Sequence, residues 1–157
     1  MNIGIFTDTY NPQVNGVVTS IKILKEELTK LGQNITIFTV HSPSVNTKKR
    51  SDVIRLPSIP FPVIPEQRIG LFFNSELISS IRSLNLDIIH TQTEFSMGIL
   101  GRIVARFLNF PVVHTYHTMY EDYTHYISKG RLDKYATILA RKASKFYCSG
   151  CSSVITP

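Results

Sequence analysis

The chain has 157 residues and a formal net charge of +6, with 43% hydrophobic and 18% charged residues. This composition is typical of one globular domain and excludes a disordered chain. No apolar run approaches the roughly 20 residues of a membrane-spanning helix, and no basic segment precedes the first apolar run, so we expect neither a transmembrane segment nor a signal peptide.

The first half of the chain alternates apolar runs with one amphipathic stretch. An apolar run predicts a buried strand over 2–7, and a helix is predicted over 16–31 with Gly32 as its stop. Further apolar runs predict strands over 35–40 and 52–56. The apolar face expected for the helix is formed by Val17, Ile21, Leu24, Leu28 and Leu31.

Residues 57–73 contain four prolines among large apolar side chains. Because proline lacks an N–H group and fixes φ, we expect a long apolar loop without regular structure. Such a loop is either buried under a partner domain or inserted into a lipid surface.

The second half continues the alternation. Its expected elements are a helix over 75–84, a strand over 86–90, a helix over 96–109, a strand over 111–116, helical segments over 120–127 and 131–147, and a strand over 153–156. The broad apolar face expected for the third helix, opposite Arg102 and Arg106, is formed by Ile99, Leu100, Ile103, Val104 and Phe107.

The strands are continuous Ile, Val and Phe runs, and amphipathic helices separate them. This order predicts an α/β fold with a Rossmann-like parallel sheet covered by helices on both faces. Ligands of such sheets bind beyond the carboxyl ends of the strands, which directs attention to the loops at 8–16, 91–96 and 117–125.

The first of these loops ends at Gly16, where a helix begins. Backbone N–H groups and the helix dipole favour anions there. The loop carries Asn11, Gln13 and Asn15 but no Lys or Arg, which suits a hydroxyl-rich ligand carrying a phosphate. Neither the dinucleotide fingerprint nor the Walker pattern is present, and a simple tight turn explains a lone glycine equally well.

Two further candidates follow the next strands. Glu94 is placed to bind sugar hydroxyls or move protons, or else only to favour the start of a helix through its charge. In the strand over 111–116, His114 and Tyr116 face one side of the sheet, and Thr115 and His117 face the other. His117, at the strand exit, is the functional candidate, while His114 is expected to be a packed, hydrogen-bonded histidine.

Two features of the C-terminal third each have an ordinary structural interpretation. Cys148 and Cys151 form a single C-x-x-C, which we interpret as two small apolar residues at the end of a helix. Six basic residues between 129 and 145 face one acid, Asp133. This cluster suits anionic lipid or nucleic acid, or is an ordinary solvated helix face.

Four motifs carry a resemblance to a known family. They are N-P-x-x-N-G-V at 11–17, D-I-I-H-T-Q at 87–92, T-Y-H-T at 115–118 and S-x-V-I-T-P at 152–157. Together they cover essentially the whole chain, which resembles the N-terminal half of a GT-B glycosyltransferase of glycosyltransferase family 4. The longer segments T-D-T-Y-N-P-Q-V-N-G-V-V-T-S-I and H-T-Q-T-E-F-S-M-G are most similar to bacterial 1,2-diacylglycerol 3-glucosyltransferases.

The resemblance implies transfer of a hexose, with retention, from a nucleotide-diphosphate sugar such as UDP-glucose to diacylglycerol, without a metal or other cofactor. It places Gly16 and Val17 at the donor diphosphate. It assigns His117 and Glu94 to catalysis, with His117 beside the donor sugar and Glu94 on the acceptor side. The residues implied on the acceptor side are Tyr10, Gln13, Asn15, Gln92 and Thr118. Many relatives have a histidine where this chain has Gln92, which puts an acid–base role there in doubt.

The family also implies a second Rossmann-like domain, which faces the first across a cleft and binds the nucleotide sugar. The chain ends at Pro157, where a full-length relative would be crossing into that domain. We therefore expect residues 1–157 to be the acceptor-side domain, inactive alone and partnered by its own C-terminal domain.

The resemblance and the charges together predict a cytoplasmic protein bound peripherally to the inner face of the cell membrane. The residues expected to meet anionic lipid are Arg68, Lys134, Arg141, Lys142 and Lys145. One alternative is a family-4 enzyme acting on another lipid or a soluble acceptor. The other is a basic nucleic-acid-binding module. The basic face lacks interleaved aromatics and any nucleic-acid motif, so we expect no nucleic-acid partner.

Overall fold

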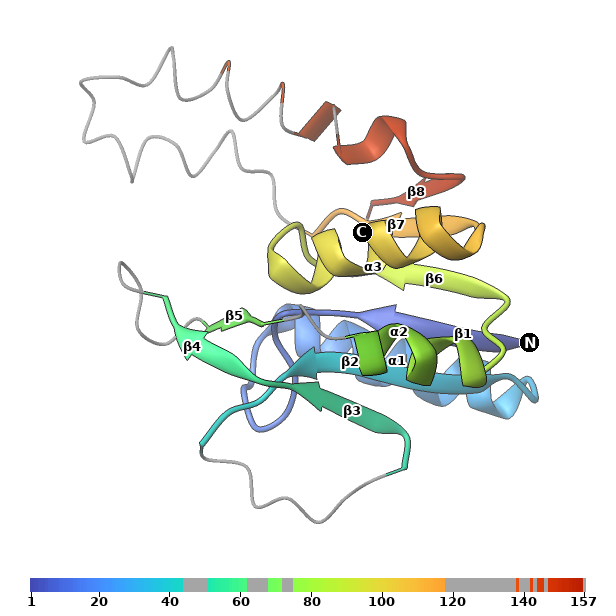
Figure 1. Ribbon diagram of the computed structural model, residues 1–157, viewed down its shortest axis with the longest axis horizontal. Helices are drawn as coiled ribbons and strands as arrows, with labels where there is room; N and C mark the ends of the chain where they lie inside the picture. Colours follow the sequence, from blue (N-terminus) through green and yellow to red (C-terminus); the bar gives the residue numbers. More distant parts are fainter. Residues whose placement is uncertain are drawn as a thin grey trace.

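The computed structural model describes residues 1–43, 51–61, 68–71, 75–117, 138, 142, 144–145 and 147–156. Its centre is a six-stranded sheet in the order β3-β2-β1-β6-β7-β8, in which every neighbouring pair is parallel (Figure 1). The strands of this sheet are β1 (Asn2–Phe6), β2 (Asn34–Val40), β3 (Val53–Leu56), β6 (Ile88–Thr91), β7 (Val112–Thr115) and β8 (Ser153–Ile155). The parallel α/β sheet expected from the sequence is confirmed.

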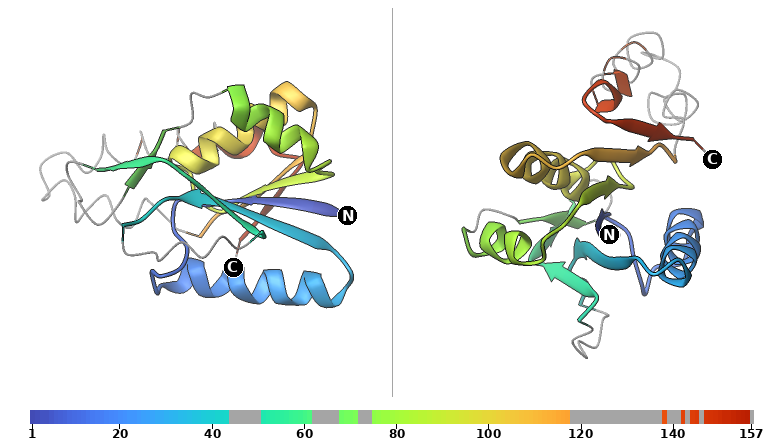
Figure 2. Two further views of the ribbon diagram at one scale, coloured as in Figure 1. Left: turned by 60° about the horizontal axis from the view of Figure 1, so that its bottom comes forward. Right: turned by 90° about the vertical axis from the view of Figure 1, so that its right-hand side faces the viewer.

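Helices cover both faces of the sheet. α1 (Gly16–Lys30) lies on one face, and α2 (Ser75–Ser83) and α3 (Ser96–Leu108) lie on the other (Figure 2). Successive strand side chains point to opposite faces, so Ile5 joins the core under α1 while Phe6 joins the core under α2 and α3. Each face is therefore an apolar layer, as continuous apolar strands require.

α1 begins and ends at the residues that the sequence indicates. The Asn15 side chain accepts a hydrogen bond from Val18 N at 2.9 Å, which caps the helix start. Gly32 has a φ of 76° and, with Gln33, donates to carbonyls of the last turn. These two bonds form the Schellman motif, in which glycine adopts the left-handed conformation without the steric strain of a Cβ atom. Leu31, expected on the apolar face, is the C-cap and is 72% exposed, so that assignment was wrong.

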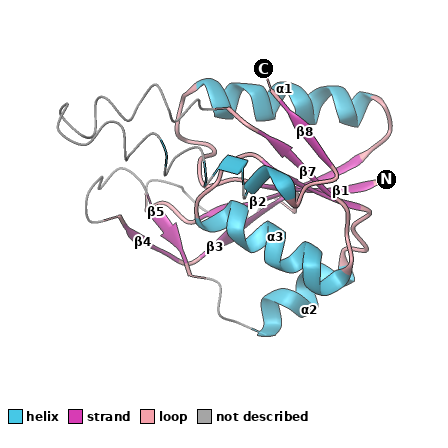
Figure 3. Ribbon diagram, turned by 90° about the horizontal axis from the view of Figure 1, so that it is seen from above, coloured by secondary structure: helices cyan, strands magenta, loops and turns pink. Residues whose placement is uncertain are grey.

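The segment 57–73 is not free of regular structure, which corrects our expectation. β4 (Ser58–Pro60) and β5 (Arg68–Gly70) pair as an antiparallel ribbon (Figure 3), with Pro60 opposite Arg68. A two-stranded ribbon consists of edge strands, where a missing N–H group is tolerated. Pro57 contributes through its carbonyl, which accepts from Leu71 N at 2.7 Å. Residues 62–67 and 72–74 lie outside the described part of the chain.

The buried face of α3 also differs from the expected one. Ile99, Ile103 and Phe107 are exposed, by 46%, 40% and 78%. Leu100 and Val104 are buried as expected, and the other buried residues of α3 are Met97, Gly98, Gly101 and Ala105.

Close approach explains which face of α3 is inward. A Cβ at Gly101 would lie 2.9 Å from the Phe6 ring, and one at Gly98 only 1.8 Å from the Thr93 carbonyl oxygen. The two glycines let the helix lie directly on the ends of β1 and β6. The apolar width of α3 exceeds what the sheet can cover, so part of it stays on the surface.

The helices predicted over 120–127 and 131–147 lie mostly outside the described residues. Those that are described between 138 and 149 are helical. They lead into β8, the outermost strand, which pairs with β7 from Ser153 opposite Val113.

Candidate functional site

The carboxyl ends of β1, β6 and β7 meet at one edge of the sheet, because the three strands are parallel neighbours. Two hydrogen bonds join the end of β1 to the segment that follows β6: Gln92 N donates to the Phe6 carbonyl at 2.9 Å, and Asp8 N donates to Thr93 Oγ1 at 3.0 Å. The loops that carry Gly16, Glu94 and His117 all start from this edge, as the sequence indicated.

The Asp8 carboxylate caps α3 from the neighbouring strand. Phe95 stands at the N-cap position of α3 but makes no side-chain cap bond. Asp8, which is 4% exposed, accepts instead from Met97 N at 3.0 Å, from the Thr93 hydroxyl at 2.6 Å and from the Ser96 hydroxyl. Burial raises the pKa of the Asp8 carboxyl, and these hydrogen bonds act against the rise.

The sequence analysis did not single out Asp8. A carboxylate directly after a buried strand, facing a helix whose own N-cap residue is apolar, is the signal that could have found it.

The first loop is held by its own polar side chains around Thr9. The Thr9 hydroxyl donates to the Gln13 side-chain carbonyl and accepts from Asn15 Nδ2 at 2.9 Å. Tyr10 is only 8% exposed and packs in the core under α1. Gln13 and Asn15 therefore fix the shape of the loop before any ligand arrives.

Gly16 lies exposed at the first residue of α1. A Cβ there would meet no atom within 4 Å, and its backbone does not need positive φ, so packing alone does not demand glycine. Arg55, which the sequence analysis did not single out, reaches this loop from β3. Its guanidinium donates to the Asn11 carbonyl at 2.6 Å and to the Val40 carbonyl at 3.1 Å. Burial lowers the pKa of Arg55.

On one face of the sheet, Gln92 joins two histidines. Its amide nitrogen lies 3.0 Å from His90 Nε2, and its carbonyl oxygen lies 2.6 Å from His117 Nε2. The Thr115 hydroxyl also contacts His90 Nε2, at 2.7 Å. Burial lowers the pKa of His90 to about 4, with smaller contributions from His114 and His117. Burial also lowers the pKa of His117, while Glu94 opposes the change.

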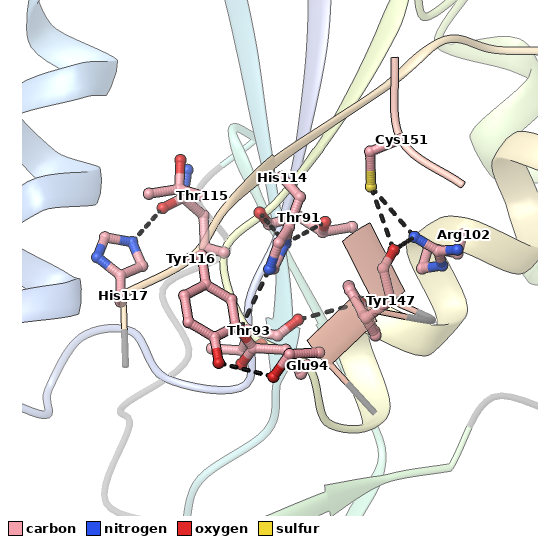
Figure 4. Close-up of polar contacts among 12 residues, drawn as sticks. Thr91, Thr93, Glu94, Arg102, His114, Thr115, Tyr116, His117, Tyr147 and Cys151 are labelled. Atoms are coloured by element: carbon pink, nitrogen blue, oxygen red, sulfur yellow. Dashed lines mark hydrogen bonds and ion pairs between the residues drawn. The ribbon is translucent and has the colours of Figure 1, made fainter. Parts of the chain in front are cut away.

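His114 lies on the other face, as period-two alternation predicted, and is fully buried. Its Nδ1 contacts the Thr91 hydroxyl at 2.8 Å and the Thr91 carbonyl at 3.1 Å, and its Nε2 lies 3.2 Å from a Glu94 carboxylate oxygen. The expectation of a packed, hydrogen-bonded histidine is confirmed. Figure 4 shows His114 and Glu94 toward α3, with His117 on the opposite side. The sequence analysis did not foresee the contact between Glu94 and His114.

Tyr147 brings the C-terminal helical segment onto this cluster. Its ring centroid lies 4.8 Å from that of His114, and its hydroxyl donates to the Thr93 carbonyl at 3.3 Å. The Arg102 guanidinium lies 4.6 Å from the centre of the Tyr147 ring and donates to Cys151 Sγ at 3.1 Å (Figure 4). Cys148 and Cys151 are free thiols, and burial raises the pKa of both. Cys151 is packed against the core, in keeping with the apolar interpretation of the C-x-x-C.

The residues expected at a membrane are only partly within the described residues. Lys142 and Lys145 are exposed, whereas Arg68 donates to the hydroxyl and the carbonyl of Ser58, both at 2.8 Å. Thr118, Lys134 and Arg141 lie outside the described residues. Over the described ranges, no helix has the length and apolar content to cross a bilayer, and no three His, Cys, Asp or Glu side chains are grouped as metal ligands.

The parallel sheet with its polar carboxyl edge is the N-terminal domain of a GT-B fold. The chain belongs to Glycosyltransferase Family 4, whose pattern matches residues 14–157.

Three relatives illustrate the range of this similarity. Alpha-monoglucosyldiacylglycerol synthase of Streptococcus pneumoniae is 52% identical over 132 residues, covering 84% of this chain and 30% of the relative. The synthase of the same name from Acholeplasma laidlawii is 40% identical over 163 residues, covering 100% and 40%. GDP-mannose-dependent alpha-mannosyltransferase of Corynebacterium glutamicum is 27% identical over 122 residues, covering 75% and 29%. The chain thus spans less than half the length of these relatives.

The low pKa of His90 makes stability depend on pH. The folded-state pKa of about 4 lies below the ordinary value of 6.5. The contribution of neutral His90 to the free energy of unfolding is therefore complete above about pH 6.5 and is lost as the pH falls toward 4. Between pH 7.5 and 4.5 this loss is about 2 kcal/mol. We expect His90→Gln, which keeps an acceptor for Gln92 and Thr115, to remove this part of the acid destabilisation.

Urea unfolding at the two pH values measures the effect. His41→Gln is the matched control, since His41 lies after β2 and is only partly buried. An equal acid loss in His90→Gln and in the parent would contradict a neutral, buried His90.

Proposed function

We propose that the full-length protein transfers glucose from UDP-glucose to diacylglycerol and that this chain supplies the acceptor-side half of the enzyme. The two relatives at 52% and 40% identity are named alpha-monoglucosyldiacylglycerol synthases, which supports both the sugar and the lipid acceptor. The observation that carries the proposal is His117, a half-buried histidine bonded to Gln92 at the same sheet edge as Gly16 and Glu94.

The proposed transfer retains the anomeric configuration. The nucleotide donor carries its glucose in the α configuration, and the relatives' names specify an alpha product. In the proposal, the amides of Gly16 and Val17 approach the donor diphosphate at the start of α1, and the C-terminal domain supplies the basic residues and the nucleotide pocket. The transfer itself uses no metal or other cofactor.

The proposed roles of the charged and polar side chains follow from their environments. The lowered pKa of His117 favours a neutral ring at pH 7, which suits hydrogen bonding to a sugar hydroxyl beside the reacting carbon. Glu94 contacts the buried His114 at the same edge, and we assign it to proton transfer. The residues proposed to shape the acceptor side are Tyr10, Gln13, Asn15, Gln92 and Thr118.

A second candidate is a family-4 enzyme with another acceptor. The similarity to a GDP-mannose-dependent alpha-mannosyltransferase favours it, because that relative is named for a different donor. The higher identity of the glucosyldiacylglycerol synthases favours the first candidate.

We further propose peripheral attachment to the inner face of the cell membrane through basic side chains. Lys142 and Lys145 are exposed on the C-terminal helical segment, and Lys134, Arg141 and Arg68 would extend the same interaction. Each such charge near an anionic surface contributes about 1 kcal/mol.

The first test is His117→Ala in the full-length protein, assayed for transfer of radiolabelled glucose to diacylglycerol. We expect transfer to be abolished while the melting temperature stays near the parent value, because the ring lies at a strand exit and not in an apolar core. His41→Ala serves as the control. Transfer within about threefold of the parent, under 1 kcal/mol, would remove His117 from catalysis.

The second test compares two double variants of equal charge change. Lys142→Gln with Lys145→Gln should weaken binding to anionic vesicles by about 30-fold, since two charges contribute about 2 kcal/mol. Lys22→Gln with Lys30→Gln, on the exposed side of α1, should leave binding near the parent value. Co-sedimentation at several salt concentrations measures both, and equal losses would assign the binding to net charge alone.

A further inference from the structure

Gln92 is the first residue after β6 and is 1% exposed. A side chain so buried influences a substrate mainly through the side chains that it holds in place. Its amide is fully engaged, with the nitrogen at His90 and the oxygen at His117. In this orientation the amide nitrogen faces His90 and the amide oxygen faces His117, so the protonated nitrogen of each ring follows from it.

The orientation of the amide determines the tautomer of His90. An amide nitrogen can only donate, so His90 Nε2, at 3.0 Å from it, accepts from Gln92, and the Thr115 hydroxyl lies 2.7 Å from the same ring nitrogen. An imidazole nitrogen that accepts carries no proton, so His90 is neutral and holds its proton on Nδ1. The lowered pKa of His90 agrees with this state.

The consequence appears at His117. The Gln92 carbonyl oxygen can only accept, so the His117 Nε2 at 2.6 Å must donate and carries a proton in both the neutral and the charged ring. The proton that His117 gains or loses therefore sits on Nδ1. Among the described residues, Nδ1 has no hydrogen-bond partner, which leaves it available to a ligand.

We propose that Gln92 is a positioning residue that fixes the proton of His117 on Nε2 and presents an unprotonated Nδ1 to a hydroxyl of the sugar being transferred. This assignment rests on the proposed role of His117 in glycosyl transfer. The charged and titratable groups around the ring are Glu94, His114 and His90, and Gln92 itself cannot ionise. The hydrogen bonds from Gln92 to His90 and His117 therefore persist over the pH range in which His90 stays neutral.

Three variants of the full-length protein test the assignment. Gln92→Leu removes both bonds of the amide at similar size. Gln92→Glu keeps an acceptor for His117 but adds a negative charge. Thr39→Val is the matched control, because it also replaces a buried polar side chain by an apolar one of similar size, in β2, where the Thr39 hydroxyl has no hydrogen-bond partner among the described residues. Melting temperatures establish that each variant folds.

The first readout is the side-chain ¹⁵N spectrum of histidine-labelled protein without substrate, with the His117 signals identified by their loss in His117→Ala. The parent and Thr39→Val should show His117 protonated on Nε2 alone at neutral pH. Gln92→Leu should show a mixture of the two tautomers. A single Nε2–H form in Gln92→Leu, or a mixture in Thr39→Val, would overturn the assignment.

The second readout is steady-state transfer against pH. Gln92→Leu should lower kcat about tenfold with the donor KM within about threefold, while Thr39→Val keeps both. Gln92→Glu should move the acidic limb of the kcat profile up by about one to three pH units, because a nearby carboxylate favours the charged ring. If Gln92→Leu does not fold, an unmoved acidic limb in Gln92→Glu rejects the proposal.

The two readouts separate this inference from the proposed function. A tautomer that changes in Gln92→Leu while kcat does not would reject a role for His117 in transfer. An unchanged tautomer would reject the hydrogen-bond assignment, whatever the rate.

Discussion

The buried carboxylate of Asp8 is the interaction on which the site depends. Asp8 lies just after β1, and its carboxylate accepts hydrogen bonds from Thr93 and from Met97 at the start of α3. It therefore connects the first loop to the segment that carries Glu94. Burying a carboxylate is costly, and here the hydroxyls, backbone amides and helix dipole that surround it offset the cost. Because α3 has no side-chain cap of its own, loss of Asp8 would loosen the helix start and the Glu94 turn together.

The sheet separates two kinds of polar interaction at this edge. On the α1 side, His90, Gln92 and His117 form a neutral chain of hydrogen bonds. On the α3 side, His114 contacts the Glu94 carboxylate under the ring of Tyr147. Because side chains alternate along β6 and β7, the Glu94 carboxylate and the His117 ring lie at the same edge of the sheet but contact different side chains.

Hydrophobic periodicity predicted the sheet and the helices, the Gly32 stop of α1 and the opposite faces of His114 and His117. Hydrophobic periodicity could not predict which polar side chains contact each other. Nothing local shows that Asp8 caps α3 or that Gln92 joins two histidines from different strands, because these contacts depend on strand order. The prediction for the inward face of α3 was right for Leu100 and Val104. It was wrong for Ile99, Ile103 and Phe107, because glycines, which carry no apolar signal, allow the closest approach. The β4–β5 ribbon was missed because proline was taken to exclude all strands, including edge strands.

The most direct test of the account is the product itself. The full-length protein would be incubated with UDP-glucose and vesicles containing diacylglycerol, and the lipid product analysed by proton NMR for its anomeric configuration. The account predicts glucosyldiacylglycerol with an α linkage and no product from the His117→Ala protein. A β-linked product, or consumption of the donor without any lipid-linked glucose, would contradict it.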